Sequence, residues 1–73
     1  MRWELFDIEA GFYFDRFDDK DEALRYVHTL LENNGDDYAN VLELGTPDDP
    51  SGASNLTGAA LLAASRSLVA LRA

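Results

Sequence analysis

The sequence predicts an α+β fold, a small two-layer domain with a β-hairpin, a helix, a third strand, a long loop and a C-terminal helix. Two N-terminal segments are rich in aromatic and branched apolar residues, as strands are. Two later segments space their apolar residues as helices do. The chain has 73 residues and no cysteine, so a single domain without disulfides is expected over 1–73. It divides into a ββαβ core over 1–45, a loop over 46–55 and a C-terminal helix over 56–73.

The N-terminal hairpin is predicted over residues 2–8 and 12–17. Gly11 between them can take the positive φ that a short hairpin loop with a bulge requires. One face of the hairpin is expected to enter the core, and it carries Phe6, Ile8, Phe12 and Phe14. Tyr13, Asp15 and Phe17 are expected on the opposite face of the second strand. Trp3 and Leu5 make the opposite face of the first strand apolar as well, so we expect the C-terminal helix or another subunit to cover it.

A first helix is predicted from the aspartates after the hairpin to about Asn33. Asp19 and Glu22 have the spacing of a capping box, and acidic residues suit the positive end of the helix dipole. Gly35, which follows two asparagines, is a strong stop signal and can adopt the left-handed C-cap. The apolar stripe of this helix consists of Ala23, Leu24, Val27, Leu30 and Leu31.

A third strand is predicted over residues 38–44. A second possibility is one short turn at Tyr38 and Ala39, with the strand starting near Val41. This strand need not lie beside the second strand of the hairpin. Residues 45–55 are dense in turn formers, and part of this loop is expected to be mobile.

The C-terminal segment is rich in alanine and leucine, which favours a helix. Asn55 or Thr57 is placed to cap it. Its apolar stripe consists of Leu61, Leu62, Ser65, Leu68 and Val69. Small residues fill most of the other faces, which suits a close contact within the domain or with another chain.

The net charge of −8 is distributed unevenly along the chain. All fourteen acidic residues lie in residues 1–49 with four basic ones, whereas residues 50–73 hold only Arg66 and Arg72. An acidic surface repels phosphates, so direct binding to nucleic acid is not expected, but it can steer a basic partner. The basic tail either docks on the acidic body or leaves that body free. No signal peptide or membrane-length apolar run is present, which predicts a cytoplasmic protein with no membrane contact.

No motif for catalysis or cofactor binding is recognisable, so we expect a protein that is not an enzyme and takes no cofactor. The glycine patterns of phosphate and dinucleotide loops are absent. His28 is the only histidine. A serine nucleophile therefore has no evident base partner, and a zinc site has no second histidine to complete it. The densest acidic cluster consists of Asp15, Asp18, Asp19, Asp21 and Glu22. Helix capping explains this cluster most simply, and weak binding of a divalent cation is the alternative.

Several short motifs lie along the first half of the chain. They are Trp3-Glu4-Leu5-Phe6-Asp7, Gly11, Phe17, Glu22-Ala23-Leu24, Asn34-Gly35 and Tyr38-Ala39. Together they resemble a group of short bacterial proteins of unknown function, in which an apolar hairpin precedes a Glu-Ala-Leu helix and an Asn-Gly turn. The resemblance covers residues 1–45 well and the helix near Gly58 loosely, and it implies a shared fold but no activity. The element order is also similar to that of HicB-type antitoxins, although this chain lacks their proline-and-glycine turn.

The function expected from these features is that of a small acidic protein-binding module, an antitoxin-like or accessory protein. Its partner is predicted to be a protein, and basic if electrostatics guide the encounter. The residues expected to contact that partner are Trp3, Leu5, Tyr13, Leu61 and Leu68. Two alternatives are a homodimer that buries the same apolar faces and a weak cation binder at the aspartates near residue 18.

Overall fold

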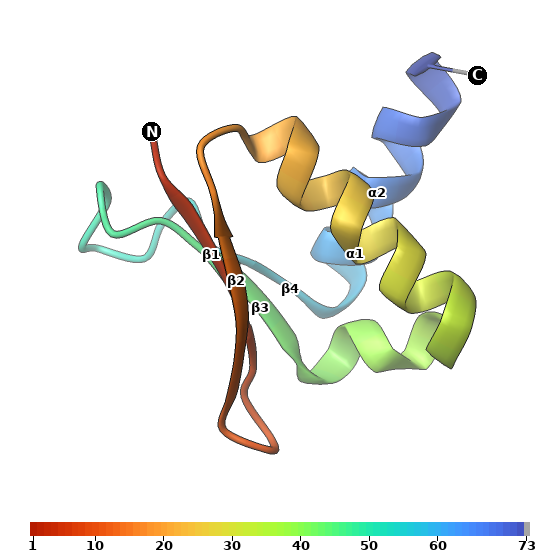
Figure 1. Ribbon diagram of the computed structural model, residues 1–73, viewed down its shortest axis with the longest axis horizontal. Coiled ribbons are helices and arrows are strands. Elements are labelled where there is room, and N and C mark those ends of the chain that lie inside the picture. The colour runs from red at the N-terminus through yellow and green to blue at the C-terminus, as the bar shows by residue number, and fades with distance from the viewer. Residues whose placement is uncertain (73) are drawn as a thin grey trace.

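A four-stranded antiparallel sheet carries both helices on one of its faces, which confirms the predicted α+β class (Figure 1). The computed structural model describes residues 1–72. The elements in chain order are β1 Trp3–Asp7, β2 Phe12–Phe17, α1 Lys20–Asn34, the 3-10 helix η1 Asp36–Val41, β3 Leu42–Gly45, β4 Leu56–Thr57 and α2 Gly58–Arg72. The strand order in the sheet is β2-β1-β3-β4, so β1 is central and β2 forms one edge.

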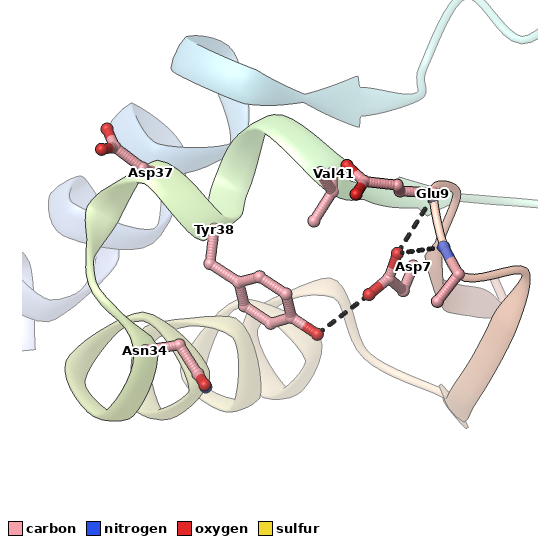
Figure 2. Close-up of a pocket in the computed structure, with 7 residues that line it drawn as sticks. Asp7, Glu9, Asn34, Asp37, Tyr38 and Val41 are labelled. Carbon is pink, nitrogen blue, oxygen red and sulfur yellow. Dashed lines mark hydrogen bonds between the residues drawn. The ribbon is translucent and has the colours of Figure 1, made fainter.

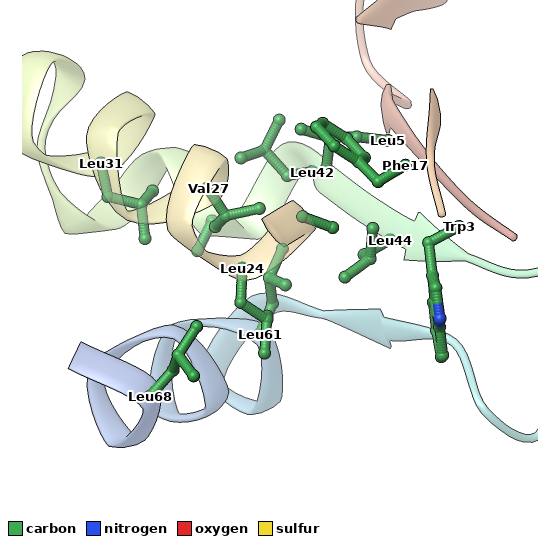
Figure 3. Close-up of a cluster of buried hydrophobic side chains, with 12 residues drawn as sticks. Trp3, Leu5, Phe17, Leu24, Val27, Leu31, Leu42, Leu44, Leu61 and Leu68 are labelled. Atoms are coloured by element: carbon green, nitrogen blue, oxygen red, sulfur yellow. The ribbon is translucent and has the colours of Figure 1, made fainter. Parts of the chain in front are cut away.

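The hydrophobic core fills the space between the sheet and the two helices (Figure 3). The sheet contributes Trp3, Leu5, Phe17, Leu42 and Leu44. The helices contribute Ala23, Leu24, Val27, Leu31, Leu61 and Leu68. These positions match the apolar stripes expected for both helices, because a helix that packs on a sheet buries one stripe of its surface.

The basic tail docks on the acidic body of its own chain. Helix α2 packs against α1 and η1, and Arg66 forms an ion pair with Asp36 of η1. Both charged side chains are largely exposed, so their pairing contributes little, and burial of Leu61 and Leu68 holds the helix in place.

Local signals place the ends of α1 as predicted. Asp19 is the N-cap, and its carboxylate accepts a 3.0 Å hydrogen bond from the amide of Asp21. At the other end, the amide of Gly35 donates to the carbonyl of Leu31, and Gly35 has a φ of 92°. Its ψ of 157° lies outside the left-handed helical region that was predicted, although the positive φ still favours glycine.

Strand β1 buries the face opposite to the one predicted as core, whereas Phe14 of β2 packs against the core as predicted. Trp3 and Leu5 are 5% and 0% exposed, whereas Ile8 is 56% exposed. The pattern of β3 explains this outcome, because directly opposite residues share a face of the sheet. Leu44 lies opposite Leu5, and the charged Glu43 lies opposite Phe6. The face of β1 that holds Leu5 is therefore the one that both helices cover.

A β-bulge resets the alternation of β2. Tyr13 and Asp15 both have partners in β1, whereas Phe14 is the extra residue between them. Neighbouring side chains at a bulge no longer alternate regularly between the two faces. Phe17 is consequently buried opposite Trp3 in the core, contrary to the face predicted for it.

The segment after α1 follows the second possibility, a short helical turn before a short strand. Residues 36–41 form η1, and β3 begins at Leu42 beside β1. Strand β4 was not predicted: Leu56 and Thr57 pair with β3, so the C-terminal helix begins at Gly58. Thr57 does not act as the predicted cap, because its hydroxyl donates a 2.6 Å hydrogen bond to the carbonyl of Leu42. The last residue of the predicted helix, Ala73, lies outside the described residues.

The loop between β3 and β4 is organised around one carboxylate. Asp49 accepts hydrogen bonds from the amide and the hydroxyl of Ser51, and from the amide and the hydroxyl of Ser54. These hydrogen bonds hold the pKa of Asp49 below its ordinary value. Three successive turns accompany them, in which the amides of Asp49, Gly52 and Asn55 each donate to the carbonyl three residues earlier.

Candidate functional site

Four of the five residues predicted to contact a partner lie inside the domain. Trp3, Leu5, Leu61 and Leu68 are between 0% and 8% exposed and pack in the core. They are apolar positions that need to be buried, as the sequence indicated, but they are buried by other parts of the same chain and not by a partner. Tyr13 alone is on the surface, at 44% exposure.

Aromatic side chains collect where β2 faces α1. We call Phe12, Phe14 and Tyr26 the aromatic strip. Phe12 and Phe14 pack edge to face, with ring centroids 4.8 Å apart, and Phe14 lies 6.3 Å from Tyr26. Phe12 is 54% exposed and Tyr26 is 37% exposed, so the core covers only part of the strip. The strip is thus a partly exposed apolar surface that ring contacts hold in order.

The other face of the hairpin is apolar too. Phe6 and Tyr13 lie opposite each other on β1 and β2, with ring centroids 5.2 Å apart. Ile8, just after β1, is exposed. Since both helices lie on the opposite side of the sheet (Figure 1), no helix of residues 1–72 covers this aromatic pair.

Strand β2 is an edge strand, and within residues 1–72 β1 is its only neighbour in the sheet. The outer side of an edge strand presents backbone amides and carbonyls that can pair with a further strand. The bulge at Phe14 and the charges of Asp15 and Arg16 limit uncontrolled pairing of this kind.

A pocket of about 450 Å³ opens beside the hairpin, between its loop and η1 (Figure 2). We call it the hairpin pocket. Its lining residues are Asp7, Glu9, Ala10, Asn34, Asp37, Tyr38 and Val41. Three of these side chains are carboxylates and none is basic, so the pocket is an electronegative concavity. Figure 2 shows the carboxylate of Asp37 turned away from Asp7, which leaves Asp7 and Glu9 as the acids nearest the hairpin.

Asp7 is fixed by three hydrogen bonds. Its Oδ1 accepts from the amides of Glu9 and Ala10 at 3.0 and 2.9 Å, and its Oδ2 accepts from the Tyr38 hydroxyl at 3.1 Å. Asp7 is only 8% exposed. Burial raises the pKa of the Tyr38 phenol above its ordinary value, and the hydrogen bond to Asp7 raises it further. The phenol is therefore held as a donor to the carboxylate.

The acidic cluster around residue 18 lies where the first helix begins. Among the described residues, no group of three or more histidine, cysteine or acidic side chains is placed to hold a metal ion. Asp19 caps α1, as the simpler explanation predicted. His28 pairs with Glu32 one turn along α1, at 3.1 Å, on the helix surface.

The sequence interpretation missed both Asp7 and Tyr38 as site residues. A local signal for Asp7 existed, because an aspartate that precedes a glycine-containing loop often accepts hydrogen bonds from amides two and three residues later. No such signal marks Tyr38, which lies 31 positions away and reaches Asp7 only through the pairing of β1 with β3.

Comparison with family models, with curated proteins and with solved structures gives no match for this chain. Within residues 1–72, neither helix has the length and apolar character needed to cross a membrane. The site itself must therefore supply the functional hypothesis.

Proposed function

We propose that this chain is a protein-binding module, which takes up a basic extended segment of a partner along the edge of β2. The proposal rests on one observation: Phe12 and Tyr13, on the outermost strand, are 54% and 44% exposed and sit beside an acid-lined pocket. Such a module acts by binding rather than by catalysis, as an accessory or antitoxin-like protein of the cytoplasm does.

Strand addition explains why an edge would be left open. An extended peptide that joins a sheet edge gains backbone hydrogen bonds, while its alternate side chains contact the two faces of the sheet. On one face those side chains would meet the aromatic strip, and on the other they would meet Phe6 and Tyr13. Apolar side chains of the partner would thus find aromatic surface on both sides of β2.

Charge selects a basic partner. The hairpin over residues 3–17 carries Glu4, Asp7, Glu9 and Asp15, with Arg16 as its one basic residue, and the whole chain has a net charge of −8. Lysine or arginine side chains would approach these carboxylates and could stack on the exposed rings. A second copy of the chain is the competing occupant of the edge, and its own charge of −8 opposes that pairing.

The test uses a labelled ten-residue peptide that alternates lysine with valine, and the same peptide with glutamate in place of lysine. Fluorescence anisotropy should detect binding of the lysine peptide only, and that binding should weaken as salt is raised. Amide resonances of residues 12–17 should shift on titration. Equal binding of both peptides, or shifts confined to α2, would contradict the proposal.

Substitution of the exposed rings tests the same surface. The double variant Phe12→Ser with Tyr13→Ser should lower affinity for the lysine peptide about tenfold, which corresponds to about 1.4 kcal/mol. Ala70→Ser, on an exposed position of α2, is the control and should bind as the unaltered protein does. Sedimentation equilibrium tests whether a second copy of the chain occupies the edge instead. If the unaltered protein is a dimer and the double variant is a monomer, the occupant of the edge is a second copy and not the proposed basic segment.

A further inference from the structure

We propose that the hairpin pocket binds a guanidinium or ammonium group carried on an aliphatic chain. This inference deepens the proposed function and rests on it for its biological meaning, because an arginine or lysine of the bound segment would supply that group. The pocket lies at the hairpin loop, next to the end of β2 where Phe12 is exposed. No residue of β2 lines the pocket, so a segment along β2 would reach it with a long side chain that passes Phe12, the cross-strand neighbour of Asp7.

The size of the pocket suits such a group. Sites for small ligands measure about 300–1,000 Å³, and the hairpin pocket measures about 450 Å³. Its walls include the Tyr38 ring, Ala10 and Val41, which are apolar surfaces for methylene groups. Its polar groups are dominated by carboxylates, so a neutral or anionic head group would find few donors and much negative charge.

Asp7 supplies the specific attraction. Its carboxylate is nine-tenths buried, and among the described residues no basic side chain forms an ion pair with it. Buried charges in proteins are normally paired with an opposite charge. The three hydrogen bonds leave one acceptor position on Oδ2, since Oδ1 accepts two donors and Oδ2 accepts one. A bound cation would occupy that position and compensate the charge.

Asp7 is also held in place before any ligand arrives. The amides of Glu9 and Ala10 and the Tyr38 hydroxyl fix the orientation of the carboxylate from three directions (Figure 2). A preorganised acceptor loses little conformational freedom on binding. The exposed side chain of Glu9 adds a second negative charge, and Glu9 contributes to the hairpin hydrogen bonds only through its backbone amide.

The probe for this inference is n-butylguanidinium, with n-butylurea as its neutral counterpart of nearly the same shape. Butylguanidinium should shift the amide resonances of Glu9 and Ala10 in a saturable way, with a Kd on the order of millimolar, because so small a ligand binds weakly. Butylurea should leave them unchanged at the same concentrations. Equal shifts with both compounds, or none with either, would overturn the inference.

Three variants test which groups hold the cation. Asp7→Asn should weaken butylguanidinium about tenfold, and Glu9→Gln about threefold, because each removes a negative charge from the site. Glu22→Gln, in the first turn of α1 and away from the pocket lining, should leave the Kd unchanged. If Asp7→Asn fails to fold, Glu9→Gln alone decides: an unchanged Kd in that variant would refute the site.

The two proposals can fail separately. If the lysine–valine peptide binds β2 but butylguanidinium does not shift the amides of Glu9 and Ala10, the pocket inference is wrong and the proposed function stands. If butylguanidinium binds the pocket while the peptide does not bind at all, the pocket is a cation site and the proposed function is wrong.

Discussion

The hydroxyl of Tyr38 donates a 3.1 Å hydrogen bond to Oδ2 of Asp7 and thereby joins η1 to the end of β1. The same carboxylate orders the hairpin loop through the amides of Glu9 and Ala10. One side chain thus connects the turn of the hairpin with the segment that follows α1. A substitution of Asp7 or of Tyr38 should therefore affect both the hairpin loop and η1.

Removing the phenol should weaken the fold and change its response to alkali. The raised pKa of Tyr38 means that the folded state holds the phenolic proton more tightly than the unfolded state, whose pKa is near 10.0. This contribution is complete below pH 10 and is lost as the pH rises through the raised folded pKa. Tyr38→Phe should lower the free energy of unfolding at pH 7 by about 1 kcal/mol.

Urea unfolding at pH 7 and at alkaline pH measures this effect. The difference between Tyr38→Phe and the unaltered protein should shrink at the higher pH. Tyr13→Phe, at an exposed position, is the control and should change the free energy of unfolding little at pH 7. A difference that is constant with pH would show that the hydrogen bond to Asp7 is not its source.

Truncating Leu5 should unfold most of the population. Its side chain is fully buried on the central strand, and a change of leucine to alanine in a core costs about 2–5 kcal/mol. A domain of this size has little stability to lose. Circular dichroism during heating should show a lost or strongly lowered transition for Leu5→Ala. Ile8→Ala, three residues along but 56% exposed, should unfold at nearly the original temperature.

Gly45 should resist replacement by alanine because Asn55 lies against it. An added Cβ would stand 3.0 Å from Oδ1 of Asn55, which is itself buried and has no hydrogen-bond partner in the described structure. Gly45→Ala should therefore cost about 1–3 kcal/mol, as overpacking does. Asn55→Ala should cost much less, and the double variant should recover most of the loss. A double variant as unstable as Gly45→Ala would place the strain elsewhere.

Asp49 should govern the order of its loop rather than the stability of the domain. Its lowered pKa means that the stabilising contribution is present above the ordinary value of 3.8 and is lost as the pH falls through the lower folded value. Asp49→Asn should speed hydrogen exchange at the amides of Ser51 and Ser54, which donate to this carboxylate. Amides of α1 should exchange as before; faster exchange throughout would contradict a local role.

Sequence reasoning succeeded where a signal is local. The cap at Asp19, the stop at Gly35 and the positive φ of Gly11 each follow from the conformational needs of one turn. The apolar stripes of both helices were also predicted correctly, because the spacing of apolar residues along a helix indicates which side is buried. The order of elements followed from these pieces.

The faces of the hairpin could not be assigned in this way. Both faces of β1 are apolar, so the choice between Phe6 and Leu5 depended on the register with β3 and on the helices above the sheet. The bulge at Phe14 then reversed the expected position of Phe17. The contact of Asp7 with Tyr38 arises only once β1 and β3 are paired, and no short window of sequence contains both residues.

The position of β1 at the centre of the sheet has a consequence for synthesis. Its residues are made before those that cover them, because Leu5 packs with residues of β3 and α2, which follow it in the chain. At about 5–20 residues per second, the 56 positions between Leu5 and Leu61 take roughly 3–11 s. During that interval the side chains of Trp3 and Leu5, which the folded protein buries, are exposed to solvent. Until α2 has packed on the sheet, the growing chain therefore exposes apolar surface that is prone to aggregation.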